Sequence, residues 1–141
     1  MKILFIADLH ANLPAFEAVL RDAGAVDAVV FLGDAVGFGP HPSECIELLR
    51  ALQPAAVIGN HDAAVLAAAP DVPPGAGSGA LWNAWTRRQL RPDQLDYLRA
   101  LPAELETLIP GNGRTRNPAC VRLLHHPPGA PYLHPAMPER A

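Results

Sequence analysis

Three short apolar runs, and the helical patterns that separate them, organise the first part of the chain. The runs occupy residues 2–7, about 27–32 and about 55–58. Apart from Lys2 and Asp27 at their first positions, the runs are apolar throughout, as strands are when both faces of their sheet are covered. Because helical patterns separate the runs, this order predicts an α/β fold in which a parallel sheet has right-handed crossover connections and flanking helices.

The two connecting segments carry the signals of amphipathic helices. Pro14 suits a first helical turn, and Gly24 suits the end of a helix. Pro42 opens the second segment, and Pro54 closes it. Apolar residues at helical spacing form one face of each predicted helix: Leu13, Phe16, Leu20 and Ala23 in the first, and Ile46, Leu49 and Leu52 in the second.

The chain divides near Ile109 into a well-patterned part, 1–109, and an irregular part, 110–141, that is rich in proline. The prolines of residues 127–141 are incompatible with a long helix or a central strand in that tail. We expect one domain that spans residues 1–141. The elements expected after residue 62 are helices at about 63–69, at about 80–90 and from about 91 onward, and strands at about 105–109 and 119–124.

Composition is that of one soluble domain. With 141 residues and 15.0 kDa, the chain has room for a single sizeable core, and 50% hydrophobic and 18% charged residues are ordinary values. No apolar run approaches the roughly 20 residues of a membrane span, and no signal-peptide pattern occurs, so we expect a cytoplasmic protein. The net charge of −3 argues against an extended nucleic-acid surface. Cys45 and Cys120 lack metal-type spacing and are expected to be free thiols.

Polar residues directly follow all three apolar runs. They are, in chain order, Asp8 and His10, then Asp34, then Asn60 and His61. The carboxyl ends of parallel strands lie at one edge of the sheet, and open α/β sheets bind their ligands there. We therefore expect these five side chains to converge on one site.

Some of these residues also have plainer interpretations. Asp8 alone could cap the helix that follows, although capping does not explain the whole set of strand-end residues. Trp82 and Trp85 are expected to be core or interface aromatics. Arg87 and Arg88 are expected to form a solvated helix end.

The donor atoms of the strand-end set suit divalent cations. Asp8 and His10 are two positions apart, so on a strand end they would face the same side and reach one cation. Asp34 could bridge two ions through its two oxygens, and Asn60 offers a carbonyl oxygen. Oxygen and nitrogen ligands without thiolate favour Mn, Fe, Zn, Ni or Co. Two such ions would clamp a phosphate and lower the pKa of a bridging water, while His61 would protonate the leaving alkoxide.

The three motifs 8–10, 33–34 and 59–62, each behind a predicted strand, resemble the calcineurin-like metallophosphoesterase superfamily, and their flanking text is similar to its small prokaryotic phosphodiesterase branch. The resemblance implies the first half of that family's β-sandwich, with helices outside. It also implies two divalent transition-metal ions, Mn foremost, and a metal-bound hydroxide as nucleophile. By this resemblance, Asp8, His10 and Asp34 bind the first metal, and Asp34 bridges to the second. Asn60 binds the second metal, and Asn60 and His61 bind the substrate. His61 is also the catalytic acid or the group that orients the phosphate.

Residues 123–128 resemble the family's next motif, a strand that ends in His-Gly. Taking His125 rather than His126 as the metal ligand aligns Pro128 and Pro131 with prolines of the family pattern. The family's later Gly-His-x-His segment does not occur among the 141 residues. We therefore expect a C-terminally truncated domain whose sheet has an exposed apolar face, which favours association into homo-oligomers.

The expected function is metal-dependent hydrolysis of a phosphomonoester or phosphodiester, with a small molecule or a nucleotide as substrate. The alternative is a catalytically impaired fragment or pseudoenzyme that retains partial metal binding or acts as an interaction module. A nucleotide-binding regulatory domain also fits the strand pattern, but it leaves His10 and His61 unexplained.

Overall fold

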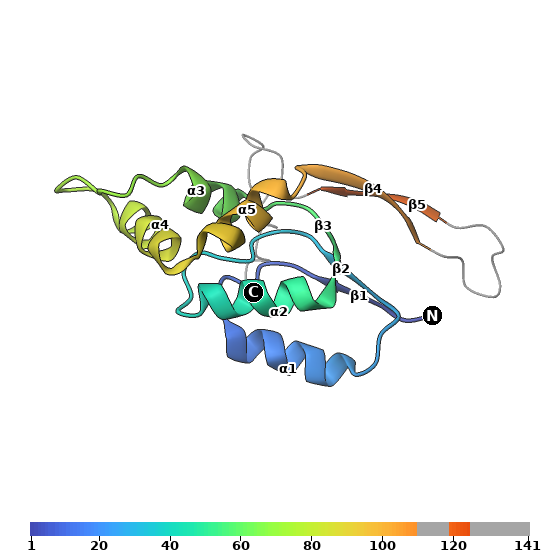
Figure 1. Ribbon diagram of the computed structural model, residues 1–141. Coiled ribbons are helices and arrows are strands. Elements are labelled where there is room, and N and C mark those ends of the chain that lie inside the picture. Colours follow the sequence, from blue (N-terminus) through green and yellow to red (C-terminus); the bar gives the residue numbers. More distant parts are fainter. Residues whose placement is uncertain (110–118, 125–141) are drawn as a thin grey trace, which may run out of the picture.

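The computed structural model describes residues 1–109 and 119–124 of the chain. Its first three strands form one parallel sheet in the order β1-β2-β3, and its last two form a separate antiparallel pair (Figure 1). The α/β fold with a parallel sheet is therefore confirmed. In chain order the elements are β1 (Ile3–Ile6), α1 (Leu13–Ala23), β2 (Ala28–Phe31), α2 (Pro42–Leu52), β3 (Ala55–Ala56), α3 (Asn60–Ala67), α4 (Ser78–Gln89), α5 (Pro92–Ala100), β4 (Glu104–Ile109) and β5 (Ala119–Leu124).

The third strand is shorter than its apolar run. β3 ends at Ala56, although the next N–H group, that of Val57, still donates to the carbonyl of Phe31 at 3.1 Å. The N–H of Ile58 donates instead to the carbonyl of Pro102 at 2.9 Å. The chain therefore leaves the β2 ladder at this point, and the predicted strand at 55–58 loses its second half to a contact with the segment between α5 and β4.

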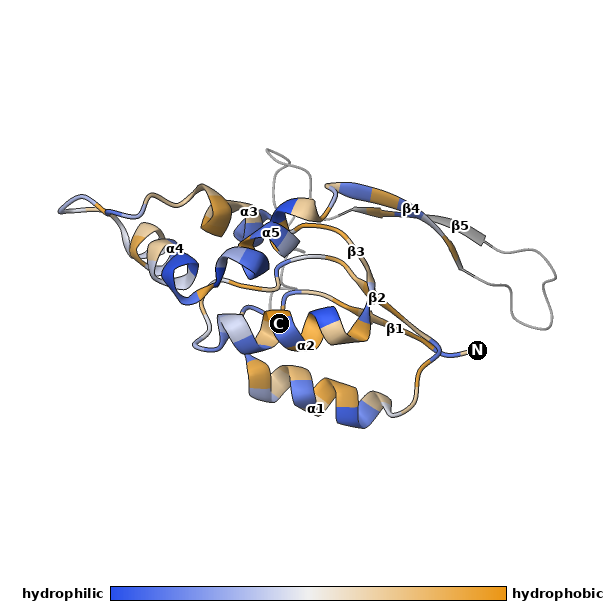
Figure 2. Cartoon of the chain, viewed as in Figure 1, coloured by the Kyte–Doolittle hydropathy of each residue, from blue (hydrophilic) through white to orange (hydrophobic). Residues whose placement is uncertain are grey.

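Helices α1 and α2 lie on one side of the parallel sheet, as Figure 1 shows. In Figure 2 the three strands are largely hydrophobic, and polar and apolar positions alternate along both helices. Phe16 of α1 and Ile46 and Leu49 of α2 are fully buried. They share a cluster with Ile6 and Phe31 of the sheet. The helical faces expected from sequence thus form the main core of the molecule.

The opposite face of the sheet is covered only in part. Val30 and Val57 form a second apolar cluster with Leu105 and Leu123 from the β4–β5 pair. Phe5 of the edge strand β1 is 49% exposed. The expectation of an exposed sheet face is therefore correct for the β1 side, whereas β4 and β5 cover the β2 and β3 side.

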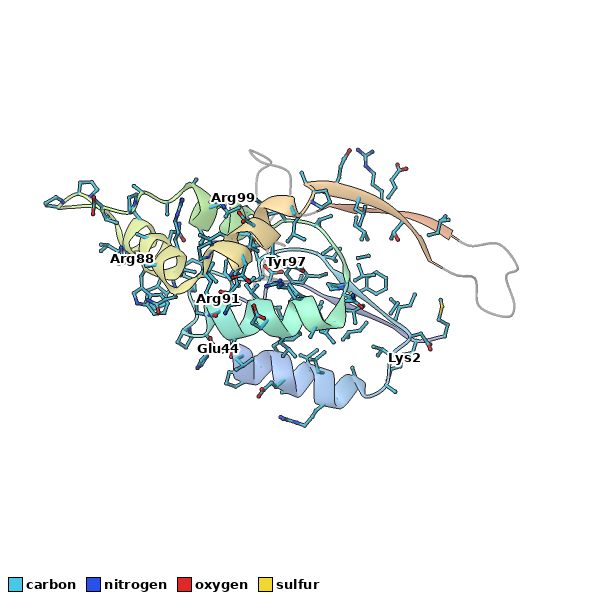
Figure 3. The ribbon with its side chains drawn as sticks, in the orientation of Figure 1. Lys2, Glu44, Arg88, Arg91, Tyr97 and Arg99 are labelled. Atoms are coloured by element: carbon cyan, nitrogen blue, oxygen red, sulfur yellow. The ribbon has the colours of Figure 1, made fainter. Side chains whose placement is uncertain are left out.

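Polar contacts join α5 to α2. Arg50 donates to Asp93 at 2.8 Å, and Arg91 donates to Glu47 at 2.8 Å. The Arg50 guanidinium also lies 5.8 Å from the centre of the Tyr97 ring, and Figure 3 shows Arg91 and Tyr97 between the two helices. Because these ion pairs are exposed, they contribute little to stability.

The expectation of a solvated Arg87 was wrong. Its side chain donates to the carbonyls of Leu66 and Ala68, at the C-terminal end of α3, and thereby satisfies two carbonyls of that helix end.

Trp82 and Trp85 stack on each other with ring centres 5.3 Å apart. Among the helices that the structure describes, none has both the length and the apolar character needed to cross a membrane.

Candidate metal centre

The loops that follow β1 and β2 continue to pair with each other after both strands have ended. The N–H of Asp8 donates to Gly33, that of His10 to Asp34 and that of Ala11 to Ala35, at 2.9–3.0 Å. These loops nevertheless depart from strand geometry, because several of their residues adopt a left-handed backbone. The non-glycine residues with positive φ in these loops are Asp8 (54°), His10 (46°), Ala11 (54°), Asp34 (62°) and Phe38 (57°).

We expected Asp8 and His10 to share one side of a strand end, and this reason for their proximity was wrong. β1 ends at Ile6, so these two side chains are not placed by the pleat of a strand. Their positions follow from the left-handed turn and from its hydrogen bonds to the loop after β2. The outcome is similar, since the Nε2 atom of His10 lies 3.6 Å from Oδ1 of Asp8.

The loops bring three of the expected residues together. His10, Asp34 and His61 each offer one potential ligand atom, and these atoms lie within 4.8 Å of one another. The Nε2 atom of His10 is 4.0 Å from Oδ2 of Asp34. Asp34 is only 2% exposed, whereas the side chain of Asp8 is 60% exposed at the rim of the cluster. A buried carboxylate beside two imidazoles is a donor set that suits a divalent transition metal.

Helix α3 begins at the cluster, three residues earlier than expected. Its first residues, Asn60 and His61, therefore stand on a helical turn rather than in a loop. The backbone N–H of His61 donates to Oδ1 of Asp34 at 2.8 Å, which ties the helix start to the loop after β2. Asn60 is exposed. The partial positive charge of the helix start favours an anion at this end of α3.

Asp62 holds this arrangement together, and sequence reasoning assigned it no role. It is fully buried, and its carboxylate accepts hydrogen bonds from the N–H groups of Asp34 (2.9 Å), Val36 (3.0 Å) and Gly59 (3.1 Å). One side chain thus fastens the loop after β2 to the start of α3. The signal that could have found it is an acidic residue three positions after the helix cap, as in a capping box.

The pKa of the Asp62 carboxyl reflects two opposing influences. Burial raises its pKa, because the charged form loses its hydration. Hydrogen bonds from backbone N–H groups lower it, and the nearby charge of Asp34 raises it again. The direction of the net shift is upward.

Two glycines permit the close approach of the loops. A Cβ atom at Gly59 would lie 2.0 Å from Oδ1 of Asp34 and 2.1 Å from its backbone nitrogen. A Cβ atom at Gly39 would lie 2.0 Å from the carbonyl oxygen of His10. Any side chain at either position would displace a residue of the cluster, so both glycines are needed for space.

The cluster fits a metal ion in one further respect. The Nε2 atom of His10 faces the carboxylates of Asp8 at 3.6 Å and Asp34 at 4.0 Å, which is beyond hydrogen-bond distance. A divalent cation between these groups would bind that nitrogen and both carboxylates. The buried Nδ1 atom of His10 has no hydrogen-bond partner among the residues that the structure describes. The remaining expected ligand, His125, lies outside the described residues.

Comparisons with known proteins agree with this geometry. The model of a family described as calcineurin-like phosphoesterase matches residues 1–137. A metallophosphoesterase from Sphaerobacter thermophilus has a similar structure, with a TM-score of 0.67 and 42% sequence identity over 83% of this chain and 49% of that one.

Two curated relatives are also similar. An uncharacterised protein of Methanocaldococcus jannaschii is 38% identical over 118 residues, which are 77% of this chain and 45% of the relative. A symmetrical bis(5′-nucleosyl)-tetraphosphatase of Methylococcus capsulatus is 39% identical over 74 residues, which are 49% of this chain and 27% of the relative. The chain thus spans half or less of the length of the relatives that it matches.

Proposed function

The chain belongs to the calcineurin-like phosphoesterase family, and from that premise we propose that it hydrolyses a phosphate ester of a small molecule or a nucleotide at the cluster of His10, Asp34 and His61. The observation that carries the proposal is the convergence of these three side chains within 4.8 Å at the carboxyl edge of the parallel sheet. Family membership supports divalent metal ions as the cofactor, and we propose Mn²⁺ as the first ion to test.

In this proposal each residue has a separate task. Asp8, His10 and Asp34 would hold one ion, and Asp34, Asn60 and His125 would hold a second. The N–H of His61 donates to Oδ1 of the buried Asp34, and the Oδ2 atom of the same carboxylate lies 4.0 Å from Nε2 of His10. Divalent ions bound there would neutralise the phosphate and lower the pKa of a water. The start of α3 adds a favourable potential for the anionic substrate.

The number of ions that the site can hold depends on the number of ligands that it offers. Within the described part of the chain, the set offers five side chains: Asp8, His10, Asp34, Asn60 and His61. A catalytic ion commonly takes three protein ligands, so five side chains suffice for one ion and leave a second dependent on water or further residues. Calorimetric titration of Mn²⁺ decides this, because two equivalents support the dinuclear centre and one equivalent contradicts it.

His61 has two candidate tasks that an experiment can separate. We propose that it is the acid that protonates the leaving alkoxide, although its ring also lies within ligand distance of the cluster. A general acid matters most for a poor leaving group. His61→Asn should therefore slow an alkyl phosphodiester by about 100-fold or more and slow a nitrophenyl ester much less, with Mn²⁺ affinity unchanged. His41→Asn, at the start of α2, is a matched control.

A different result would reassign His61. If His61→Asn weakened Mn²⁺ binding and slowed both esters equally, His61 would be a metal ligand rather than an acid.

The choice of substrates to test first follows from one of the relatives. One relative is named a symmetrical bis(5′-nucleosyl)-tetraphosphatase, so dinucleoside polyphosphates belong beside simple aryl and alkyl esters in the first substrate panel.

A further inference from the structure

Phe38 is an unusual residue for its place. It lies in the loop between β2 and α2, where its ring is 56% exposed and its backbone φ is +57°. A bulky residue seldom adopts the left-handed region, and such strain gathers at functional sites. An exposed apolar ring beside a polar cluster gains little from burial. Phe38 therefore combines an exposed apolar ring with a strained backbone, and it is not part of the main core.

The ring of Phe38 contacts both imidazoles of the cluster. Its centre lies 5.5 Å from that of His10 and 4.8 Å from that of His61, and both pairs meet edge to face. The two imidazoles are themselves 4.9 Å apart at 85°. Mutual edge-to-face contact of three rings is a favourable arrangement that restricts the orientation of each ring.

Hydrogen bonding does not restrict the imidazole of His10 within the described part of the chain. Its Nδ1 atom has no partner there, and its Nε2 atom lies 3.6 Å from Asp8, beyond hydrogen-bond distance. Metal-binding imidazoles are usually oriented by a hydrogen bond from the ring nitrogen that does not bind the metal. In this cluster the contacts that orient His10 are instead those between rings.

Gly37 supplies the other side of this arrangement. A Cβ atom there would lie 3.4 Å from Cβ of His61 and 3.8 Å from Nδ1 of His10. Its φ of +99° is likewise one that glycine tolerates best. Gly37 therefore faces the same two histidines as the ring of Phe38, and a side chain at Gly37 would come into contact with both.

We propose that Phe38 is a positioning residue that orients the imidazole of His10 for a bound divalent cation and the imidazole of His61 for proton transfer to the leaving group. The inference rests on the proposed function, because it assumes that these imidazoles serve a metal-dependent reaction. The strained backbone of Phe38 then has a reason, because it directs the aromatic ring at both histidines from a short loop.

The test compares Mn²⁺ affinity, measured by calorimetric titration of the full chain, with the thermal midpoint of the metal-free protein. Phe38→Asn removes the ring but keeps a residue that tolerates positive φ. We expect about 10-fold weaker Mn²⁺ binding, with an unchanged or higher metal-free midpoint. Phe38→Tyr should restore the affinity, because it restores the ring. Leu81→Asn, at a residue of α4 that is 53% exposed, is the matched control and should change neither quantity.

Three results would overturn the role of Phe38. Equal Mn²⁺ affinity in wild type and Phe38→Asn, with a raised KM for aryl but not alkyl esters, would make the ring a substrate contact. A large fall in the metal-free midpoint that Phe38→Tyr does not reverse would make it a structural residue. Failure of the wild-type chain to bind Mn²⁺ would refute the proposed function itself, and is thereby distinguished from the first two results.

Discussion

The face of the parallel sheet under α1 and α2 differs in construction from the carboxyl edge of the same sheet. On the face covered by α1 and α2, buried apolar residues such as Phe16 and Leu49 sit in regular elements. The carboxyl edge is formed by the loops 8–12 and 33–41 and by the start of α3 at 59–62, here together called the edge loops. They contain five of the six non-glycine residues that have positive φ in the described part of the chain. The covered face therefore supplies stability, whereas the edge loops hold polar groups in strained positions that local preferences do not favour.

Asp62 should show the largest effect, because it is the buried residue on which the edge loops depend. Asp62→Ala leaves the N–H groups of Asp34, Val36 and Gly59 without their acceptor. We expect a loss of about 3–5 kcal/mol in the free energy of unfolding, measured by urea denaturation, together with loss of Mn²⁺ binding. Asp62→Asn keeps one acceptor oxygen and should lose less. A stable Asp62→Ala variant that still binds Mn²⁺ would remove Asp62 from the account.

Leu49 tests the other side of the comparison. It is fully buried in the main core, so Leu49→Ala should lower the free energy of unfolding by about 3 kcal/mol. Because Leu49 belongs to the covered face, Mn²⁺ affinity should be unchanged at temperatures where the variant is folded. A loss of affinity as large as that of Asp62→Ala would mean that the two regions are not separable.

Among the described residues outside the edge loops, Gln53 is the one non-glycine residue with positive φ, at +47° after the C-terminal end of α2. Helices commonly end with glycine in this conformation. Gln53→Gly should therefore stabilise the protein by up to about 1 kcal/mol, seen as a higher thermal midpoint without a change in Mn²⁺ affinity. Destabilisation would show that the left-handed conformation at Gln53 carries no strain to relieve.

The smallest effect should come from the surface pairs of α5. Hydrogen bonds from Arg91 and Arg50 lower the pKa of Asp93 to about 2. Since the folded-state pKa lies below the ordinary value of 3.8, the stabilisation is present above about pH 4 and is lost as the pH falls toward 2. Asp93→Asn should therefore lower the thermal midpoint slightly at pH 6 and not at all near pH 2. A difference that persists at pH 2 would exclude this charge effect.

The regular elements were accessible from sequence because their signals are local. Residues close together in the chain define the apolar faces of α1 and α2 and the three strand runs. The structure has both helices, and it pairs the three strands in a parallel sheet. The start of α3 was placed too late, because its first residues, Asn60 to Asp62, are polar and carry no apolar period. Their helical conformation depends on hydrogen bonds to the loop after β2, which is distant in sequence.

The edge loops could be predicted only in part for the same reason. The residue types at the strand ends indicated a metal site, and the structure brings His10, Asp34 and His61 together. The left-handed backbone at Asp8 and His10 depends on pairing between two loops, which no local pattern encodes. The capping of α3 by Arg87 is likewise a contact between helices that are separate in the chain.

The central claim is that the edge loops form a metal-dependent hydrolytic site. Its most direct test is the hydrolysis of an aryl phosphodiester by the 141-residue chain with added Mn²⁺, beside its Asp34→Asn variant. Asparagine tolerates the φ of +62° at this position, so the variant removes the charge and not the fold. The account predicts Mn²⁺-dependent turnover that falls by about 100-fold or more in Asp34→Asn. Absence of Mn²⁺-dependent turnover from wild-type protein shown to be folded would contradict it.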